Sequence, residues 1–503
     1  MRTLGAAHRW RRSFVIGDRL PTRWLLWHGA GQAGQSVQGF ALGFLFIYYN
    51  QVLGLPGTLA GLALAITSIV DAVTDPTVGS WSDGYRSRWG RRHPFLIVSV
   101  IPIGILFVAL FAPPPWLTDF QLFLWFTVVY SLMRTALTLY NVPYLALGAE
   151  VTQNYHERTR IASFRAFIGK GAALIVAAVG WNFVFNSTPD NPTPQLTVEP
   201  YLPFAIVSGV VMAAFMGVSA WKTMDVIPQL PTMGVDGRRF HVRHIYGDLI
   251  EALRGLPFRS LFCGHLICTI YWGTTGTLVL HLQTFFWQLD SLAIQWWQYA
   301  GIVGGMVGIP FTPFFNRVFD KKWSVILGVV VCVLGATGPV MLALAGLMPT
   351  SYVLLVPLLV AFAFLSEFAI EPVGVSVASM MGDMADEHEL RVGSRQEGVY
   401  FAAFNFAGKC SGAIGPLVAG IAIDIVGLDP NSTPGEVPAE VLFDFGLVYA
   451  ALAVFVMLAI WVFWPYNLNR KRHAEIVAAL RRRRVERTEG APGEKEAGQA
   501  ARA

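Results

Sequence analysis

The sequence predicts an all-α membrane protein with twelve transmembrane helices. Of its 503 residues, 54% are hydrophobic and only 14% are charged, whereas about 25% charged residues is typical of soluble domains. The mean hydropathy is +0.50. Apolar runs of roughly twenty residues, the length of a helix that crosses a bilayer, recur along nearly the whole chain. These observations exclude the soluble, disulfide-rich secreted, disordered and coiled-coil classes.

The apolar runs are bounded by polar, Pro-rich or Gly-rich segments. The first, second, fourth, tenth and eleventh runs also contain Gly, Asn, Gln or charged residues, which favours helices that line a pathway. The fourth and tenth are long enough to tilt or to extend beyond the hydrocarbon. The predicted spans are 25–49, 58–81, 94–112, 120–149, 160–185, 201–222, 259–286, 293–316, 323–346, 352–382, 397–423 and 442–466.

Lys and Arg residues collect on one side of the predicted membrane. Six connections that alternate along the chain contain neither residue, whereas the N-terminal segment, the other connections and the C-terminal tail are rich in them. Since Lys and Arg concentrate in cytoplasmic segments, we expect both termini in the cytoplasm and the helices in a bacterial inner membrane. The net charge of +5 then reflects topology, and no nucleic-acid partner is expected.

Motifs that would indicate an enzyme or an ATP-driven pump do not occur. The sequence has no Walker loop, no nucleophile elbow and no histidine set with metal-ligand spacing. Its four cysteines fall inside apolar runs, where small core residues are expected instead of disulfides or metal ligands. We therefore expect neither enzymatic activity nor a cofactor.

The chain divides into two halves of six spans. The longest connection, 223–258, lies between the sixth and seventh spans, and a short basic turn follows the second span of each half. Duplicated six-helix units with a substrate site between them are typical of the major facilitator fold. We predict a cytoplasmic N-terminal segment 1–24, bundles 25–222 and 259–466, a cytoplasmic central loop 223–258, and a basic cytoplasmic tail 467–503 with a disordered end.

Ionisable residues within the spans mark the candidate site, because each costs roughly 3 kcal/mol to insert. Asp71 and Asp75 are four residues apart, so their carboxylates share one helix face. Two ionised carboxylates repel, which favours uptake of a cation or a proton. Lys409, if it faced them, would compete with that cation and couple ion binding to a change of state. The others are Arg134, Arg165, Lys170, Glu367 and Glu371; static salt bridges between helices are the alternative interpretation.

Aromatic and amide side chains occur in the fourth and eleventh spans. Stacking faces together with amide donors and acceptors suit a sugar ring, and packing between helices is the alternative interpretation. The candidates are Tyr140, Asn141, Tyr144, Tyr400 and Asn405.

The motif around the acid pair resembles the helix 2 and loop 2–3 signature of the glycoside-pentoside-hexuronide:cation symporters, the melibiose permease family. The helix 4 to 5 and helix 10 to 11 passages are similar in order and spacing, and the resemblance covers essentially the whole membrane domain. The segments are Asp71–Pro76, Ser82–Pro94, Asn141–Arg165, Met381–Gly398 and Lys409.

The resemblance implies a major facilitator symporter. Asp71, Asp75 and Thr74 would bind the coupling cation, Na+ or H+, and Lys409 would link the cation and substrate sites. Arg165 would contact the substrate. The loop after the second helix would gate the transporter through Asp83, Arg88, Arg91 and Arg92.

Two positions depart from the pattern of that family. Acids that recognise sugar on helices 1 and 4 of the melibiose permease correspond to Gln35 and Asn141. Their replacement argues against a galactoside substrate and leaves the cation pair intact. Glu371 has no counterpart in the pattern and could supply a carboxylate from the second half.

Three functions stay open at this point. The first is Na+ or H+ coupled symport of a sugar, glycoside or related small solute by rocking of the two halves. The second keeps this mechanism with a lysophospholipid or other amphiphile as the substrate. The third is a non-transporting membrane sensor that reuses the fold. The expected partners are the bilayer, a small-molecule substrate and the coupling cation, and a monomer is expected.

Overall fold

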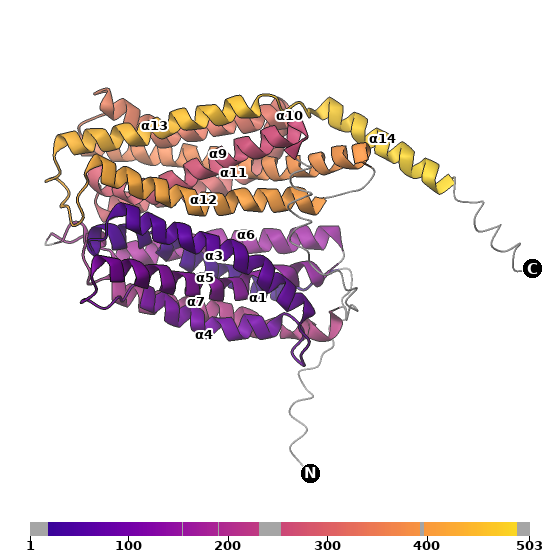
Figure 1. Cartoon of the computed structure of the whole chain (residues 1–503), viewed down its shortest axis with the longest axis horizontal. Coiled ribbons are helices and arrows are strands. Elements are labelled where there is room, and N and C mark those ends of the chain that lie inside the picture. Colours follow the sequence, from indigo (N-terminus) through magenta and orange to yellow (C-terminus); the bar gives the residue numbers. More distant parts are fainter. Residues whose placement is uncertain (1–18, 153, 190, 231–252, 393–396, 490–503) are drawn as a thin grey trace, which may run out of the picture. The chain divides into compact units, whose positions relative to one another are not determined.

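The computed structural model describes residues 19–489, except 153, 190, 231–252 and 393–396. The described chain is built of helices joined by short connections (Figure 1), with an isolated β-bridge between Thr188 and Asn191. The predicted all-α class is confirmed. Most of the N-terminal segment and of the central loop, and the predicted disordered end of the tail, lie outside the described residues.

The first six predicted spans correspond to helices of the structure. Two of them end in short π-helical or additional α-helical turns that extend the span. The elements are α1 (Thr22–Leu42) with α2 (Leu45–Ile47) and η1 (Tyr48–Val52), α3 (Gly57–Gly84), α4 (His93–Leu110), α5 (Asp119–Glu150), α6 (Tyr155–Val179) with η2 (Gly180–Val184), and α7 (Tyr201–Lys222).

The second six spans are found as five long helices. The helix α10 covers two predicted spans, and the non-helical backbone of Asp320 (φ 64°, ψ 156°) marks the junction between its two parts. The elements are α9 (Leu256–His281) with η5 (Leu282–Phe286), α10 (Ser291–Leu344), α11 (Tyr352–Val392), α12 (Glu397–Val426) and α13 (Ala439–Phe463), followed by α14 (Arg470–Glu489).

Nine helices within the described residues are long and apolar enough to cross a membrane. The helix α10 counts once in this set although it covers two predicted spans. The helices α1 and α9 are outside it because Gly, His, Gln and Thr residues lower their hydropathy. Both helices correspond to spans that the sequence predicts, 25–49 and 259–286.

Contacts divide the chain into two units, and we describe each by itself. Unit 1 comprises Met1–Phe240, Gly276–Tyr299 and Gly412–Leu442, and unit 2 comprises His241–Thr275, Ala300–Ser411 and Phe443–Ala503. In unit 1, α1 packs on α6 and α7, while α3 and α4 pack on α5. This packing sets α3, which carries the predicted acid pair, directly against α5 (Figure 1).

An aromatic cluster holds the ends of α1, α6 and α7 together in unit 1. Phe44 stacks on Phe185 with ring centroids 4.5 Å apart, and Trp181, Tyr201 and Phe204 surround this pair. All five side chains are buried. Aromatic pairs in this range add about 0.5–1.5 kcal/mol each beyond the burial of their area, so the cluster is a rigid anchor for the helix ends.

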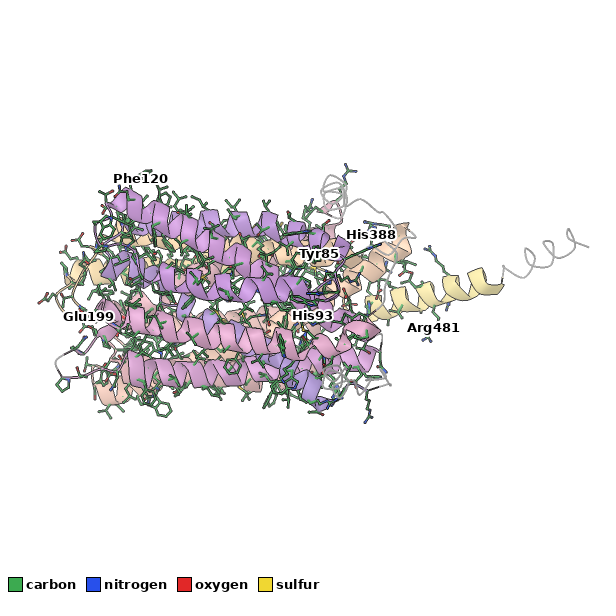
Figure 2. All side chains as sticks on the ribbon, turned by 90° about the horizontal axis from the view of Figure 1, so that it is seen from below. Tyr85, His93, Phe120, Glu199, His388 and Arg481 are labelled. Atoms are coloured by element: carbon green, nitrogen blue, oxygen red, sulfur yellow. The ribbon has the colours of Figure 1, made fainter. Side chains whose placement is uncertain are left out.

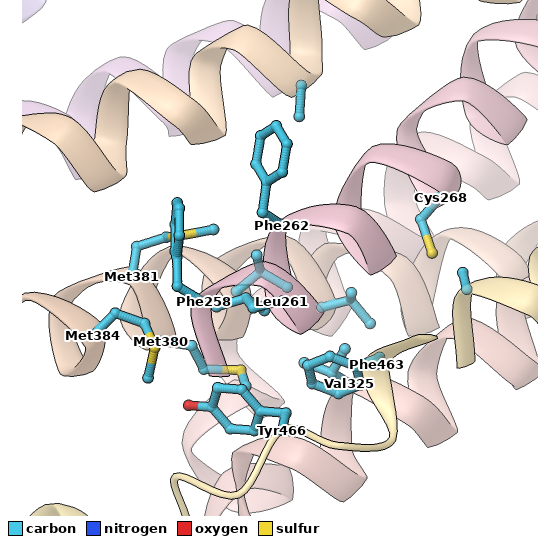
Figure 3. Close-up of a cluster of buried hydrophobic side chains, with 14 of the residues drawn as sticks. Phe258, Leu261, Phe262, Cys268, Val325, Met380, Met381, Met384, Phe463 and Tyr466 are labelled. Atoms are coloured by element: carbon cyan, nitrogen blue, oxygen red, sulfur yellow. The ribbon is translucent and has the colours of Figure 1, made fainter. Parts of the chain in front are cut away.

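A second apolar core lies in unit 2 (Figure 3). It packs Phe258 and Leu261 of α9 against methionines of α11 and against Phe463 and Tyr466. Ile476 and Leu480 of α14 belong to the same core and are 1% and 7% exposed. The first part of the predicted basic tail is therefore a helix packed on α11.

The same local structure precedes the second helix of each predicted half. η1 is followed by Gly54 with φ 81°, and η5 is followed by Gln288 with φ 49°. In both places a backbone amide donates a hydrogen bond to the carbonyl six residues earlier. Leu55 donates to Tyr49 and Leu289 donates to Gln283, each at 2.9 Å. This recurrence supports the internal duplication that the sequence predicts.

The first half of α3 crosses the 412–426 part of α12 in unit 1 at backbone contact distance. A Cβ atom on Gly420 would lie 2.0 Å from the Gly57 carbonyl oxygen, and one on Gly61 would lie 2.4 Å from that of Pro416. The Asp424 carboxylate accepts hydrogen bonds from the Gly57 and Thr58 amides at 2.8 and 2.7 Å. These amides begin α3 and carry partial positive charge, so Asp424 caps the helix that holds the acid pair.

Two glycine variants of α12 are expected to differ in their effect on stability. Gly420→Ala forces α3 and α12 apart because its Cβ meets backbone, and we expect a loss of about 1–3 kcal/mol. Gly408→Ala is the matched control, since nothing lies within 4 Å of its Cβ, and better helix propensity should leave stability unchanged or slightly higher. Thermal unfolding of the purified protein measures both; equal shifts would contradict the close crossing.

Candidate cation and substrate site

The candidate cation site is built by two helices that face each other in unit 1. On α3, Asp71 and Asp75 project one turn apart, and Asp71 is 2% exposed. On α5, Arg134 and Thr138 have the same four-residue spacing. Because α3 packs along α5, the two pairs of side chains meet.

Polar contacts connect all four of these side chains. Arg134 Nη2 forms an ion pair with Asp71 Oδ2. The Thr138 Oγ1 atom lies 2.8 Å from Asp75 Oδ1 and 3.1 Å from Asp71 Oδ1. The Thr138 hydroxyl therefore bridges the two carboxyl groups. We call this set, Asp71, Asp75, Arg134 and Thr138, the acid cluster.

The acid cluster combines oxygen ligands with one ion pair. Its carboxyl and hydroxyl oxygens are hard ligands. In its ion pair the Asp71 side chain is 3% exposed and the Arg134 side chain 30% exposed. Among the residues that the structure describes, no group of three or more His, Cys, Asp or Glu side chains could hold a metal ion.

The residues of the predicted cation site are only partly those of the acid cluster. The Thr74 hydroxyl donates to the backbone carbonyl of Asp71 at 3.3 Å, within its own helix, and its role as a ligand stays a prediction. Thr138 was not among the predicted site residues. Its position four residues after Arg134 was the available signal, because that spacing puts both on one face of α5.

The predicted substrate residues of unit 1 fall into two groups. Tyr140 and Tyr144 are 0% and 1% exposed, and their hydroxyls donate to the carbonyls of Met216 and His28 at 3.2 and 2.8 Å. These tyrosines pack between helices, so direct contact with a substrate would require movement.

Gln35 and Asn141 form the other group. The Nε2 atom of Gln35 and the Oδ1 atom of Asn141 are buried and have no hydrogen-bond partner within the described part of the chain. Such orphaned polar atoms are rare in folded proteins and call for an explanation. Arg165 of α6 is half-buried and acts electrostatically on Tyr144.

The remaining candidates lie in unit 2, where their roles stay predictions. Lys409 is half-buried on α12, and Asn405 is exposed one turn before it. Tyr400 is 3% exposed and meets the ring of Phe258 edge-on at 4.7 Å. Glu371 is half-buried on α11.

The predicted gating residues form a charge network at the ends of α3, α4 and α5. Arg92 is 4% exposed; it contacts Asp83, and it donates to Ser82 Oγ at 2.6 Å and to Glu150 Oε1 at 2.6 and 3.0 Å. Arg91 Nη2 lies 3.0 Å from the same Glu150 oxygen. Figure 2 labels Tyr85 and His93, which flank this network at one end of the helices. Glu150 was not predicted as a site residue.

Arg88, the fourth predicted gating residue, lies apart from these ion pairs. Its guanidinium carbon is 5.6 Å from the centroid of the Trp89 ring. A cation–π contact at an exposed position contributes about 0.5–1 kcal/mol, so its local role is modest.

A corresponding network occurs in unit 2. Lys321 Nζ lies 2.5 Å from Asp383 Oδ2, and His473 Nε2 lies 3.4 Å from Asp383 and 3.2 Å from Asp386. Lys321 follows the second span of its predicted half, and Asp383 lies near the end of the helix that forms the fourth span. Arg92 and Glu150 have the same relation in the first half. In unit 2 the His473 contact also attaches α14 to this network.

Comparison with known proteins identifies the family and agrees with the fold. A family model described as MFS/sugar transport protein matches residues 27–470. The chain is 25% identical over 470 residues to the uncharacterized symporter YjmB of Bacillus subtilis, covering 92% of this chain and 96% of that protein. It is 25% identical over 474 residues to the putative glycoside/cation symporter YagG of Escherichia coli, covering 91% and 95%.

A vertebrate relative and a solved structure extend the comparison. The chain is 24% identical over 487 residues to the sodium-dependent lysophosphatidylcholine symporter 1-B of Danio rerio, covering 89% and 87%. Its fold is similar to a bacterial homologue of the human lysosomal transporter Spinster, with a TM-score of 0.59 at 11% identity, covering 91% and 96%. The chain therefore belongs to the MFS/sugar transport family, the melibiose permease-like cation symporters of the major facilitator superfamily, and is a multi-pass membrane transporter and not an enzyme.

Proposed function

We propose that this protein couples the entry of a cation to the uptake of a sugar, glycoside or related small polar solute across a bacterial inner membrane. The observation that carries the proposal is the acid cluster, in which Asp71 and Asp75 share the Thr138 hydroxyl. Two carboxyl groups held one helical turn apart repel each other when both are ionised. Binding of the coupling cation at these oxygens would relieve that repulsion.

Alternating access requires that α3 change its surroundings during transport. This helix carries the acid cluster, the Asp424-capped crossing at one end and the Arg92 network at the other. A change in the charge of the acid cluster would therefore act on α3, which is held at both of its ends by polar contacts. In this scheme Lys409 on α12 links the cation to the substrate, as the sequence predicts.

A polar solute is favoured by Gln35 and Asn141. The two buried amide atoms offer one donor and one acceptor without a partner among the described residues. Hydroxyl groups of a sugar or a similar polyol can both accept and donate, so they match this pair. Arg165 would contact an acidic group if the solute carries one, such as a hexuronide.

Lysophospholipid transport is the second candidate. It is favoured by the similarity, over most of both chains, to a protein named as a sodium-dependent lysophosphatidylcholine symporter. The absence of acids at Gln35 and Asn141 would leave space for an uncharged or zwitterionic headgroup. The two candidates differ in the solute and share the coupling site.

Uptake into proteoliposomes tests the proposal. Sugars, glucuronides and lysophosphatidylcholine are offered under imposed Na+ or H+ gradients, with Asp71→Asn/Asp75→Asn vesicles as the control. We expect uphill accumulation of at least one small polar solute that collapses with the ion gradient. Accumulation of lysophosphatidylcholine alone would favour the second candidate, and gradient-independent equilibration in both proteins would contradict coupling.

A further inference from the structure

We infer that unit 2 contains a binding site for the phosphate headgroup of an anionic phospholipid, separate from the proposed coupling and substrate residues. The site lies between the turn at Asp320 of α10 and the start of α14. Arg317, Val318, Phe319 and Lys471 line a cavity of about 600 Å³ there, which is within the size range of small-molecule sites. We call it the α14 cavity.

Basic side chains of the α14 cavity provide the first argument. Arg317 and Lys471 are exposed, and neither has an ion-pair partner among the residues that the structure describes. The Arg470 guanidinium, which also borders the cavity, donates to the carbonyls of Asn316 and Arg317 at 2.7 and 2.8 Å. These acceptors are neutral, so they fix the position of the guanidinium without cancelling its charge.

The acid in the same lining does not balance these cations. Asp320 Oδ1 accepts a hydrogen bond from the Lys321 amide at 2.6 Å, and Asp320 Oδ2 accepts one from the Arg470 amide at 3.0 Å. Three cations and this one carboxylate line the α14 cavity, which leaves an excess of two positive charges. Guanidinium groups bind phosphate through paired hydrogen bonds, so an anionic phosphate matches the cavity.

The charges of the adjoining cavity are paired within the protein. Lys321 and Asp383 both line it, and Lys321 Nζ lies 2.5 Å from Asp383 Oδ2. His473 Nε2 lies 3.4 Å from Asp383 and 3.2 Å from Asp386. The unbalanced positive charge therefore belongs to the α14 cavity and not to this neighbouring network.

Apolar side chains in the lining favour a phospholipid over a soluble phosphate. Val318 and Phe319 are 56% and 41% exposed and border the same cavity as the cations. A soluble phosphate gains nothing from these side chains, whereas the acyl chains of a phospholipid can cover them. The combination of cationic and apolar lining is what an amphiphilic ligand with an anionic headgroup requires.

Tryptophans close to the cavity in sequence mark the level of the membrane–water interface. Trp323 and Trp464 are 48% and 55% exposed, with ring centroids 5.4 Å apart. Lys322 Nζ lies 5.8 and 5.2 Å from the centroids of these rings. Exposed tryptophans and lysines of this kind are typical of the headgroup level. The sequence predicts this side to be cytoplasmic, where anionic phospholipids attract basic segments.

A headgroup in the α14 cavity would connect two elements of unit 2. Arg317 belongs to α10, whereas Arg470 and Lys471 begin α14. A phosphate bound to both elements would add to the apolar contacts of Ile476 and Leu480 that hold α14. Since a ligand that binds only the folded state stabilises it, we expect an anionic phospholipid to raise the unfolding temperature.

Lipid titration of the purified full-length protein in detergent tests the inference. Thermal unfolding is followed with phosphatidylglycerol, with phosphatidylcholine of the same acyl chains and with inorganic phosphate, at one ionic strength. Native mass spectrometry counts the lipids that stay bound. The test variant is Arg317→Ala/Lys471→Ala. The matched control is Arg481→Ala/Arg482→Ala, which removes the same charge from exposed positions of α14 outside the cavity.

We expect phosphatidylglycerol to stabilise the wild type and to bind more tightly than phosphatidylcholine. Each basic side chain near an anionic lipid contributes about fivefold in affinity, so the test variant should bind phosphatidylglycerol about twenty-five-fold more weakly. The control variant should keep the affinity of the wild type. Both variants change exposed side chains, so without lipid both should unfold at the temperature of the wild type.

The contrary results are equally specific. Equal affinity of the wild type for the two lipids, or equal losses in the two variants, would overturn the site. Stabilisation by inorganic phosphate that the test variant removes, without a preference for phosphatidylglycerol, would overturn the lipid assignment in favour of a soluble anion. If the test variant does not fold, Lys471→Gln replaces it, with Arg482→Gln as the control. The experiment requires no ion gradient and no transport substrate, so its outcome is independent of the proposed function.

Discussion

Asp75→Asn is expected to eliminate uphill accumulation of the substrate. A membrane potential of 100 mV is worth about 2.3 kcal/mol for each charge moved, so symport of one cation supports roughly fiftyfold accumulation at that potential. Asparagine cannot release or take up the proton, nor provide the charge that holds a cation. Uptake should then stop at equal concentrations on both sides.

Counterflow measurements distinguish this loss of coupling from a loss of folding. Asparagine resembles a protonated carboxyl group in shape and charge, so the variant should still exchange labelled for unlabelled substrate. Asp119→Asn, at the exposed start of α5, is the matched control and should accumulate normally. Gradient-driven accumulation by Asp75→Asn with unchanged ion dependence would remove Asp75 from the coupling site.

Glu150→Gln is expected to cost about 3 kcal/mol of stability. Glu150 accepts two hydrogen bonds from Arg92, whose side chain is 5% exposed, and pairs with Arg91. Neutral glutamine leaves two arginines close together with less negative charge around them. The unfolding temperature of the purified protein should fall clearly.

An exposed ion pair provides the control for this variant. Arg472 and Glu475 lie 3.2 Å apart on α14, with side chains 57% and 54% exposed. Pairs of this kind contribute roughly 0–1 kcal/mol, so Glu475→Gln should change the unfolding temperature little. Equal effects of Glu150→Gln and Glu475→Gln would mean that the network around Arg92 does not hold the helix ends together.

The spans were predictable because the bilayer imposes a length and a polarity on each helix. The second predicted span, 58–81, differs from α3 (Gly57–Gly84) by three residues at most. The junction at Asp320 separates two predicted spans within the continuous assignment of α10. The bounds of a span can be predicted from hydropathy because hydropathy depends only on the residues of that segment.

The partners within the site were less predictable. The spacing of Asp71 and Asp75 put both on one face of a helix, but no periodicity tells which side chains of α5 lie opposite. Tyr140 is a second case in which the sequence pattern does not tell what a side chain contacts. The stacking face of its ring favours a substrate contact, and packing between helices is the alternative interpretation. In the structure the ring is buried and the hydroxyl donates to the Met216 carbonyl.

The sequence by itself determined that this chain crosses a membrane many times, that its helices contain a few costly charges, and that its motifs resemble those of cation symporters. Composition and local spacing contain all of that. Only the tertiary structure decided that Arg134 and Thr138 complete the acid pair, that Glu150 binds Arg92 and that Asp424 caps α3. These contacts join residues 58 to 367 positions apart, and such pairings are set by how helices pack against one another and not by the pattern within any one of them.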